Sequence, residues 1–482
     1  MKLKSLSLPM SFVFFGCLPH WSCGKKEDDT PKAAPSANLR MAIVAGGAAS
    51  TSSFNLADVP FSGFVNGSIA SGTPDEMSVS ITKISLANSS TNSETPIFSE
   101  PTGKPLTIEG SRVDISSFFT KIECLKEDGT IIEVPEGKTC KCGVTAAGEL
   151  IQQEETTDQT GAKVLSCPPP KEGEIPPFAV LPVEQTGDYD VLKIEYLNRG
   201  EASGCVSGKF ASGDATHCTK TGKDLDAAAA TTADFPATGP TPATIYWSKA
   251  GKGMNSFNKS YPIGSTISIT ADDEESPKLT FLIDRGRLLR FFTGTTSQGP
   301  NPVEGLPGSR AYFFSTVFED STYVFVGQPG NIRGYRYAAY VAKNKTPSDS
   351  FPAAGSRSCT SNCSYVNGWM TIIEDKDGKP FAVSMMPDDD NSFTVSKGSN
   401  ALPNKPGSID SSKITVNSDK TWTLQYSLFG QSGKGLAGTF YKLNPELAVG
   451  TSQTIEMEAE YNDSQPTQPF RTWGEVTLQR GL

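Results

Sequence analysis

The chain has 482 residues, of which 20% are charged and 37% are hydrophobic, and its formal net charge is -10. Its 45 glycines and 34 prolines indicate a chain rich in turns. An acidic chain without a basic cluster lacks the cations that replace counterions along a phosphate backbone, so we expect no nucleic-acid partner. No internal apolar run reaches about 18 residues, so the sequence predicts no membrane-spanning helix.

The first 22 residues have the three parts of a secretory signal peptide. Lys2 and Lys4 give a positive start, and residues 6–15 ("LSLPMSFVFF") form an apolar core. The stretch "GCLPHWSC" that follows offers cleavage sites. We therefore expect residues 1–22 to be a signal peptide that is removed.

Two cysteines near this cleavage region resemble the processing site of bacterial lipoproteins, in which a cysteine becomes the first mature residue and carries acyl chains. Gly16 precedes Cys17, whereas Ser22 precedes Cys23 and "GKKEDDTPKAAPSAN" follows it in the manner of a lipoprotein tether. Cleavage before Cys23 also leaves eight further cysteines, an even number that can all pair. We expect a lipid such as palmitate on Cys23, with Cys17 as the alternative. A cleaved signal without lipid is the third interpretation.

This resemblance implies a protein held in the cell envelope through its lipid. Each buried methylene of an acyl chain contributes about 0.8 kcal/mol, and more than one chain gives stable anchoring. Gly24, in place of Asp, resembles the outer-membrane address of enteric bacteria. We therefore expect an outer-membrane lipoprotein, facing either the periplasm or the surface. Residues 23–55, rich in Ala, Ser, Gly, Lys and Pro, are predicted to form a lipidated flexible tether.

Short alternating segments dominate the rest of the chain. "MSVSITKISLA" (residues 77–87), with one slip of phase, and "YDVLKIEYL" (residues 189–197) alternate apolar and polar residues, which is typical of half-buried strands. Further along, residues 369–386 predict a hairpin with Asp377-Gly378 in its turn, and residues 412–430 predict another. The last strand is expected in "TWGEVTLQ".

No long segment has a helical apolar stripe, so we predict an all-β protein with two antiparallel β-sandwich or barrel-like domains. The expected boundaries are a disulfide-stapled sandwich over residues 56–218, a linker over 219–243 and a larger antiparallel β domain over 244–482. "VDISSFF" followed by "LPVEQTGDYDVLKIEYL" resembles β-sandwich domains of uncharacterised bacterial lipoproteins. That resemblance implies a fold for the first domain and no activity.

Eight cysteines follow Cys23, and an exported chain with an even number of cysteines predicts disulfides. We expect Cys205 to pair with Cys218, and Cys359 with Cys363. Cys140 and Cys142 are too close together to pair comfortably, so each should meet Cys124 or Cys167 in an order that the sequence leaves open. A zinc site is the alternative for Cys124, Cys140, Cys142 and Cys167, although their spacing departs from the paired C-x2-C pattern.

The sequence offers little for catalysis, and we expect no catalytic residues and no resident cofactor. If cleavage falls before Cys23, the mature chain has a single histidine, His217, which we expect in a solvated loop. The acidic loops Asp272–Glu275 and Asp388–Asp390 could serve a carbohydrate-active hydrolase that uses two carboxylates. They could also bind calcium through oxygen ligands, and solvated loop acids are the simpler interpretation.

Aromatic residues of the second region are the remaining candidates for binding. We single out Trp247, Trp369 and Trp422, which could stack on sugar rings from the face of a sandwich, whereas such residues more often fill a core. Together these features predict a membrane-anchored envelope lipoprotein with a binding or structural role and a glycan or protein ligand. The carbohydrate-active hydrolase is the alternative.

Overall fold

The computed structural model describes most of the chain after residue 36. The described residues are 37–46, 69–109, 112–157, 163–168, 171, 174–210, 213–219, 245–247, 255–271, 276–285, 288–293, 312–316, 322–327, 332–342, 348–361, 363–374, 380–387, 407–429, 435–448, 451–462 and 470–480. The proposed signal peptide, both candidate lipidation cysteines and residues 220–243 of the expected linker lie outside them. No helix in this part of the chain is long and apolar enough to cross a bilayer.

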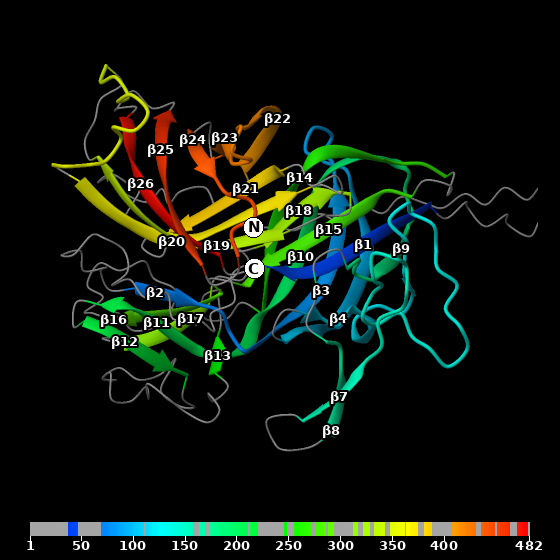
Figure 1. The fold of residues 1–482 in the computed structure, drawn as a ribbon. Helices are drawn as coiled ribbons and strands as arrows, with labels where there is room; N and C mark the ends of the chain where they lie inside the picture. Colours follow the sequence, from blue (N-terminus) through cyan, green and yellow to red (C-terminus); the bar gives the residue numbers. More distant parts are fainter. Residues whose placement is uncertain are drawn as a thin grey trace, which may run out of the picture. The chain divides into compact units, whose positions relative to one another are not determined.

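The fold is all-β, as predicted, and its first part is a sandwich of two sheets (Figure 1). One sheet has the order β18-β15-β1-β9-β6, with strands Thr322–Val326, Lys278–Asp284, Ala37–Gly46, Phe178–Val183 and Ile122–Glu123. The other has the order β13-β10-β3-β4-β5, with strands Ile245–Trp247, Gly187–Ser203, Glu76–Ala87, Glu94–Glu109 and Arg112–Val113. β14 (Ser256–Ile269) also pairs with β10.

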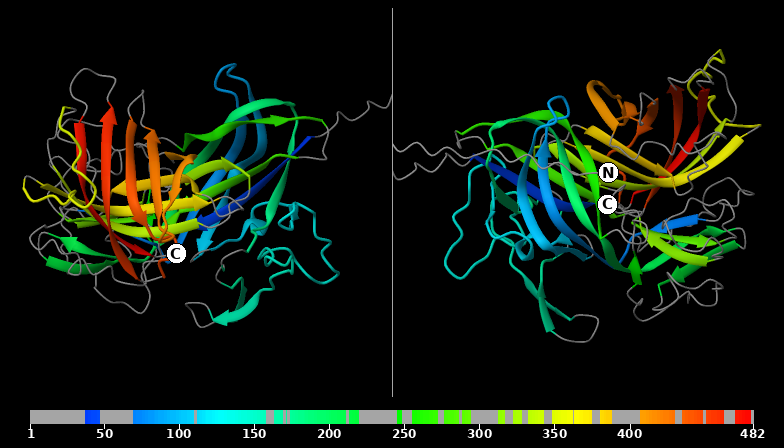
Figure 2. Two further views of the ribbon diagram at one scale, coloured as in Figure 1. Left: turned by 45° about the horizontal axis from the view of Figure 1, so that its top comes forward. Right: turned by 180° about the vertical axis from the view of Figure 1, so that it is seen from behind.

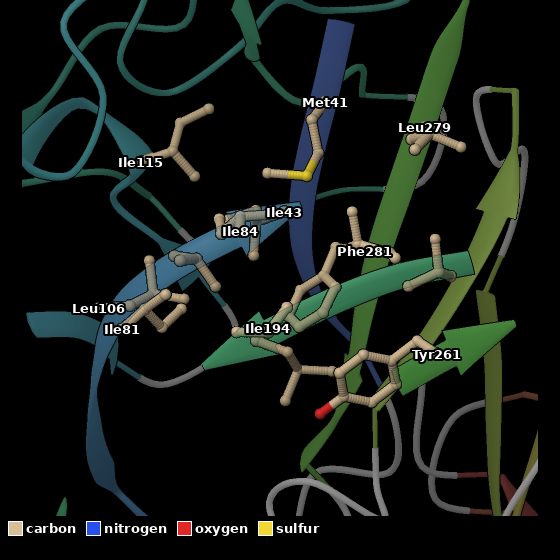
Figure 3. Close-up of a cluster of buried hydrophobic side chains, with 14 of the residues drawn as sticks. Met41, Ile43, Ile81, Ile84, Leu106, Ile115, Ile194, Tyr261, Leu279 and Phe281 are labelled. Atoms are coloured by element: carbon tan, nitrogen blue, oxygen red, sulfur yellow. The ribbon is translucent and has the colours of Figure 1, made fainter. Parts of the chain in front are cut away.

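One hydrophobic core lies between these two sheets (Figure 3). Met41 and Ile43 of β1 and Phe281 of β15 come from the first sheet, while Ile84 of β3 and Ile194 of β10 come from the second. All five are buried, and each such side chain contributes about 1.5 to 3 kcal/mol when it leaves water. Two-sided burial of this kind is what makes the pair of sheets a sandwich.

The slip of phase in residues 77–87 corresponds to a β-bulge. The alternation of buried side chains in β3 runs through Val79 and Ile81 and then resumes at Ile84. The pairing of β3 with β4 shifts register between Ile81 and Lys83. An inserted residue reverses the faces of everything that follows it in a strand, so the bulge returns the apolar side chains to the core.

Smaller sheets and a disulfide-linked region accompany the sandwich. They comprise a sheet of β17 (Tyr312–Thr316), β16 (Leu289–Thr293) and β2 (Ile69–Gly72), the hairpin of β11 (Cys205–Phe210) and β12 (Gly213–Cys218), the hairpin of β7 (Glu154–Thr157) and β8 (Lys163–Ser166), and a short 3-10 helix at Ile115–Ser117. The β7–β8 hairpin projects away from the sheets in all views (Figures 1 and 2). A separate small core, which includes Leu125, Val144 and Ile175, supports the loops between β6 and β9.

The second part of the fold is a closed antiparallel barrel (Figure 2). Each strand pairs with the next along the chain, and β26 closes the barrel on β19. Its strands β19 to β26 are Ile332–Ala342, Cys363–Glu374, Pro380–Pro387, Gly407–Val416, Trp422–Phe429, Gly435–Leu443, Ser452–Asn462 and Phe470–Arg480. The pairings of β20 with β21 and of β22 with β23 confirm the two hairpins, and β26 contains the expected last strand.

The expected domain boundaries need correction. Residues 37–46, which the sequence places in the tether, form the strand β1, whose Leu39, Met41 and Ile43 are buried. β14 and β15, expected in the second domain, pair with β10 and β1 of the sandwich. The β1–β15 pair is also parallel, unlike the antiparallel pairing that we expected. The sandwich therefore extends from residue 37 to about residue 327, and the barrel begins at β19.

All eight cysteines of the described region pair. Cys205 bonds to Cys218 across β11 and β12, and Cys359 bonds to Cys363, as expected. The connectivity that the sequence left open is Cys124–Cys140 and Cys142–Cys167. The sulfurs are thus in disulfides rather than in the alternative zinc site.

A loop over residues 348–361, which we call the strap, lies against the outer face of β24 and β25. The guanidinium of Arg357 donates to Glu456 at 3.1 Å and to Glu458 at 3.0 Å, and it lies 4.2 Å from the ring centre of Tyr441. The Gly355 amide donates to Glu456 at 3.0 Å. These contacts fix the strap on the barrel, and the Cys359–Cys363 disulfide joins its end to β20.

Candidate ligand-binding site

Charged side chains interrupt the apolar inner face at one end of the barrel. On β19 the buried residues Tyr335, Tyr337, Ala339 and Val341 alternate toward the barrel core, and Arg333 continues that series at the start of the strand. Glu374 continues the series of Met370 and Ile372 on β20, and Arg480 that of Val476 and Leu478 on β26. Because side chains alternate with a period of two, all three charged groups share the inner face.

Arg333 and Glu374 form a buried ion pair. Nε and Nη2 of Arg333 both donate to the carboxylate of Glu374, the latter at 3.2 Å, and Nη1 donates to the carbonyl of Pro445 at 2.6 Å. The side chain of Glu374 is 1% exposed. A two-point guanidinium–carboxylate contact of this kind fixes orientation as well as charge.

Arg480 lies next to this pair, beside Tyr335. Tyr335 and Arg480 are directly opposite in the β19–β26 register. Nη1 of Arg480 donates to the Tyr335 hydroxyl at 3.2 Å, and its guanidinium lies 5.3 Å from the ring centre. Burial raises the pKa of Tyr335, although Arg480 acts in the opposite direction. The tyrosine is therefore a neutral phenol near neutral pH.

The backbone around Arg480 is fixed as well. Its amide donates to the carbonyl of Thr451 at 2.9 Å, which ties the end of β26 to the start of β25. Arg480 is 7% exposed, and its Nε is buried without a hydrogen-bond partner in the part of the chain that the structure describes. The cluster of Arg333, Glu374, Tyr335 and Arg480, which we call the barrel-end cluster, can thus offer a positively charged donor to an acceptor.

The three tryptophans singled out from the sequence lie on three different strands. Trp422 lies at the same end of the barrel, where it packs partly buried against the core, and the Arg333 guanidinium is 6.0 Å from its ring. Trp247 is in β13 of the sandwich sheet and Trp369 is in β20 of the barrel. The side chains of Trp247 and Trp369 lie outside the described part, so the sugar-stacking hypothesis stays a prediction for them.

The candidate catalytic acids cannot be placed, because Asp272–Glu275 and Asp388–Asp390 lie outside the described residues. The hydrolase and calcium interpretations therefore stay predictions. Within the described ranges, no group of three or more His, Cys, Asp and Glu residues could hold a metal ion.

His217 is not a solvated loop histidine, contrary to our expectation. It lies in β12, is 5% exposed, and stacks on Phe291 with 4.2 Å between ring centres. The neighbouring Cys218 holds β12 to β11 through its disulfide with Cys205. The ring therefore packs in the interior of the fold, where the sequence had suggested only a polar loop.

Comparison with protein-family models, with curated proteins and with solved structures finds no match to this chain. Two guanidinium groups and one carboxylate share a buried apolar setting, with a neutral phenol between them. Such a setting favours an anion and disfavours a cation.

Sequence reasoning missed the barrel-end cluster, although a signal for it is present. In the stretches "IRGYRYAAYV" and "EVTLQR", an arginine occupies the phase of the strand that is otherwise apolar or aromatic. A glutamate does the same in "MTIIE". A charge in phase with buried residues at a strand end indicates a buried pair or a site, whereas a charge out of phase indicates the solvent face.

Proposed function

We propose that this chain is an exported lipoprotein of the cell envelope, addressed to the outer membrane, that binds a ligand or partner without catalysing a reaction. The sequence supplies the signal peptide and the candidate lipidation sites Cys23 and Cys17. Palmitate or a similar acyl chain on Cys23 would hold the sandwich and the barrel at the membrane surface.

The observation that carries the proposal of export is the pairing of Cys124, Cys140, Cys142, Cys167, Cys205, Cys218, Cys359 and Cys363 into four disulfides. Structural disulfides persist in oxidising compartments and are rare where thiols are kept reduced. A chain that pairs every described cysteine is consistent with folding after export. This supports the same compartment that the signal peptide suggests.

The binding role is supported by the architecture of the barrel. A closed barrel of eight strands either fills its interior with side chains or encloses one small ligand. Here the described interior is largely filled, and the barrel-end cluster is where charged groups interrupt it. Binding at that end, or at the outer surface of the barrel by a glycan or protein, fits a closed barrel whose strap is joined to β20 by the Cys359–Cys363 disulfide.

Lipidation can be tested with two single variants. The chain is expressed in a lipoprotein-processing bacterium with radiolabelled palmitate, beside Cys23→Ser and Cys17→Ser. We expect label and membrane association in the wild type and in Cys17→Ser, and loss of both in Cys23→Ser. The reverse pattern would move the anchor to Cys17. Absence of label from all three would contradict the lipoprotein proposal.

The side of the membrane on which the barrel lies determines which class of partner it can reach. Protease added to intact cells, compared with lysed cells, digests the barrel only if it faces outward. Digestion on intact cells would favour capture of an external glycan or protein. Protection until lysis would favour a partner inside the envelope and would exclude an adhesive role.

A further inference from the structure

Arg480 carries a buried positive charge with no matching negative charge in the described part of the chain. Its guanidinium contacts Tyr335, through one hydrogen bond and through the ring face. No salt bridge to Arg480 is formed by the described residues, and its buried Nε has no acceptor among them. An arginine cannot lose its proton in a protein, so it cannot relieve this situation by becoming neutral.

Neither neighbour supplies the missing charge. Glu374 is the only carboxylate of the barrel-end cluster, and it makes a two-point contact with Arg333. Tyr335 could compensate only as a tyrosinate, and burial raises its pKa instead. Among the described residues, no negative charge therefore balances the guanidinium of Arg480 in this apolar interior, where an isolated charge is strongly unfavourable.

We propose that Arg480 and Tyr335 form a binding site for a compact monovalent anion at the end of the barrel. The anion accepts from the free Nε–H of Arg480, while the Tyr335 hydroxyl accepts from Nη1 on the opposite edge of the same guanidinium and holds it in place. It balances the charge of Arg480 as Glu374 balances that of Arg333.

The packing of the neighbouring side chains limits the size of the ligand. Tyr337 and Leu478, the next inward-facing residues on β19 and β26, are fully buried in the barrel core. A long acyl tail or a sugar beside Arg480 would have to displace them. Chloride and formate, which represent a halide and a small carboxylate, are the ligands that fit this setting and share the required chemistry.

The test measures how the stability of the full mature chain to urea depends on which anion is present. The protein is dialysed into sodium gluconate, whose anion is bulky, and unfolded by urea while chloride or formate replaces gluconate at constant ionic strength. We expect the unfolding midpoint to rise and then saturate with one or both small anions. At a concentration one hundred times the dissociation constant, the unfolding equilibrium constant should fall about 100-fold.

Arg480→Met should abolish this dependence, because it removes the charge and keeps an apolar side chain of similar length. Arg471→Met is the matched control, since Arg471 on the same strand is already paired with Glu460 at 3.1 Å, and it should keep the dependence. If Arg480→Met does not fold, two other measurements test the site. One is the anion dependence of Arg480→Lys, and the other is line broadening of the chloride-35 or formate resonance by the wild type. Equal midpoints in all anions, with no broadening by the wild type, would overturn the proposal.

Discussion

At the scale of single residues, the ion pair of Arg333 and Glu374 should matter for the stability of the barrel mainly because removing one partner leaves the other as an unpaired buried charge. Glu374→Gln leaves a buried guanidinium without its carboxylate, which costs about 3 to 5 kcal/mol in comparable cases. We expect the free energy of unfolding in urea to fall by that order. The double variant Arg333→Met with Glu374→Leu should recover most of the loss, because it removes both charges together. A single variant as stable as the wild type would contradict the assignment of this pair to the interior.

Glu456 should make the strap sensitive to acid. Burial acts to raise the pKa of Glu456, but hydrogen bonds from the amides of Gly355 and Arg357 and from the Arg357 guanidinium outweigh it and lower the pKa. A carboxylate with a lowered folded-state pKa contributes stability above its ordinary pKa, and this contribution is lost as pH falls through the lowered value. The groups that face it are Arg357 of the strap, Glu458 on the same strand, and the residues directly opposite on the neighbouring strands, Glu475 of β26 and Tyr441 of β24. Burial chiefly raises the pKa of Tyr441, to about 12.

We therefore expect the amides of Gly355 and Arg357 to lose hydrogen-exchange protection as the solution is acidified from neutral pH. The protection is corrected for the intrinsic pH dependence of exchange. Glu456→Gln should show weak protection at every pH, whereas Glu446→Gln, at an exposed position, should behave as the wild type does. Constant protection of the wild type into strong acid would show that other contacts hold the strap.

At the scale of elements, the disulfides should differ in how much they stabilise the fold. Cys205 and Cys218 are 13 residues apart, and Cys359 and Cys363 are 4 apart. Loop-closure entropy predicts about 3 kcal/mol for the first bond and about 2 kcal/mol for the second. The variant with both Cys205 and Cys218 changed to Ser should therefore unfold at lower urea than the variant with both Cys359 and Cys363 changed. The opposite order would indicate that the strap bond supports more structure than its own short loop.

Closure of the barrel depends on a close approach at Gly474. This residue of β26 is paired with Val341 of β19, and a Cβ atom at Gly474 would lie 2.0 Å from the carbonyl oxygen of Tyr340. We expect Gly474→Ala to destabilise the chain by about 1 to 3 kcal/mol, since the two backbones must separate. Glu475→Ala, at the next position, is the control and should be close to neutral. An unchanged melting temperature for Gly474→Ala would contradict this contact.

The sequence predicted individual strands better than their partners. The alternation in residues 77–87 and 189–197 identified β3 and β10, and the two barrel hairpins followed from turn residues between alternating runs. These are local signals, because a hairpin pairs with its neighbour along the chain. The pairing of β1 with β15 joins segments more than 200 residues apart, and no local pattern specifies it.

The same limit explains the errors in the domain boundaries and in the site. β1 lies in an Ala-rich stretch whose composition resembles the tether before it, so its alternation at Leu39, Met41 and Ile43 was overlooked. The barrel-end cluster contains residues from β19, β20 and β26, and its chemistry depends on these three strands lying side by side in the fold. Even cysteine number predicted complete pairing, whereas the choice between Cys124 and Cys167 for Cys140 required the fold.

At the scale of the whole molecule, the central claim is that the chain is processed, oxidised and lipidated as an envelope lipoprotein. The most direct test is the intact mass of the protein isolated from the membrane fraction, measured before and after reduction. We expect a chain that begins at Cys23, carries acyl groups on that residue, and gains eight hydrogens on reduction of its four disulfides. A mass that corresponds to an unmodified N-terminus, with no gain on reduction, would contradict the account.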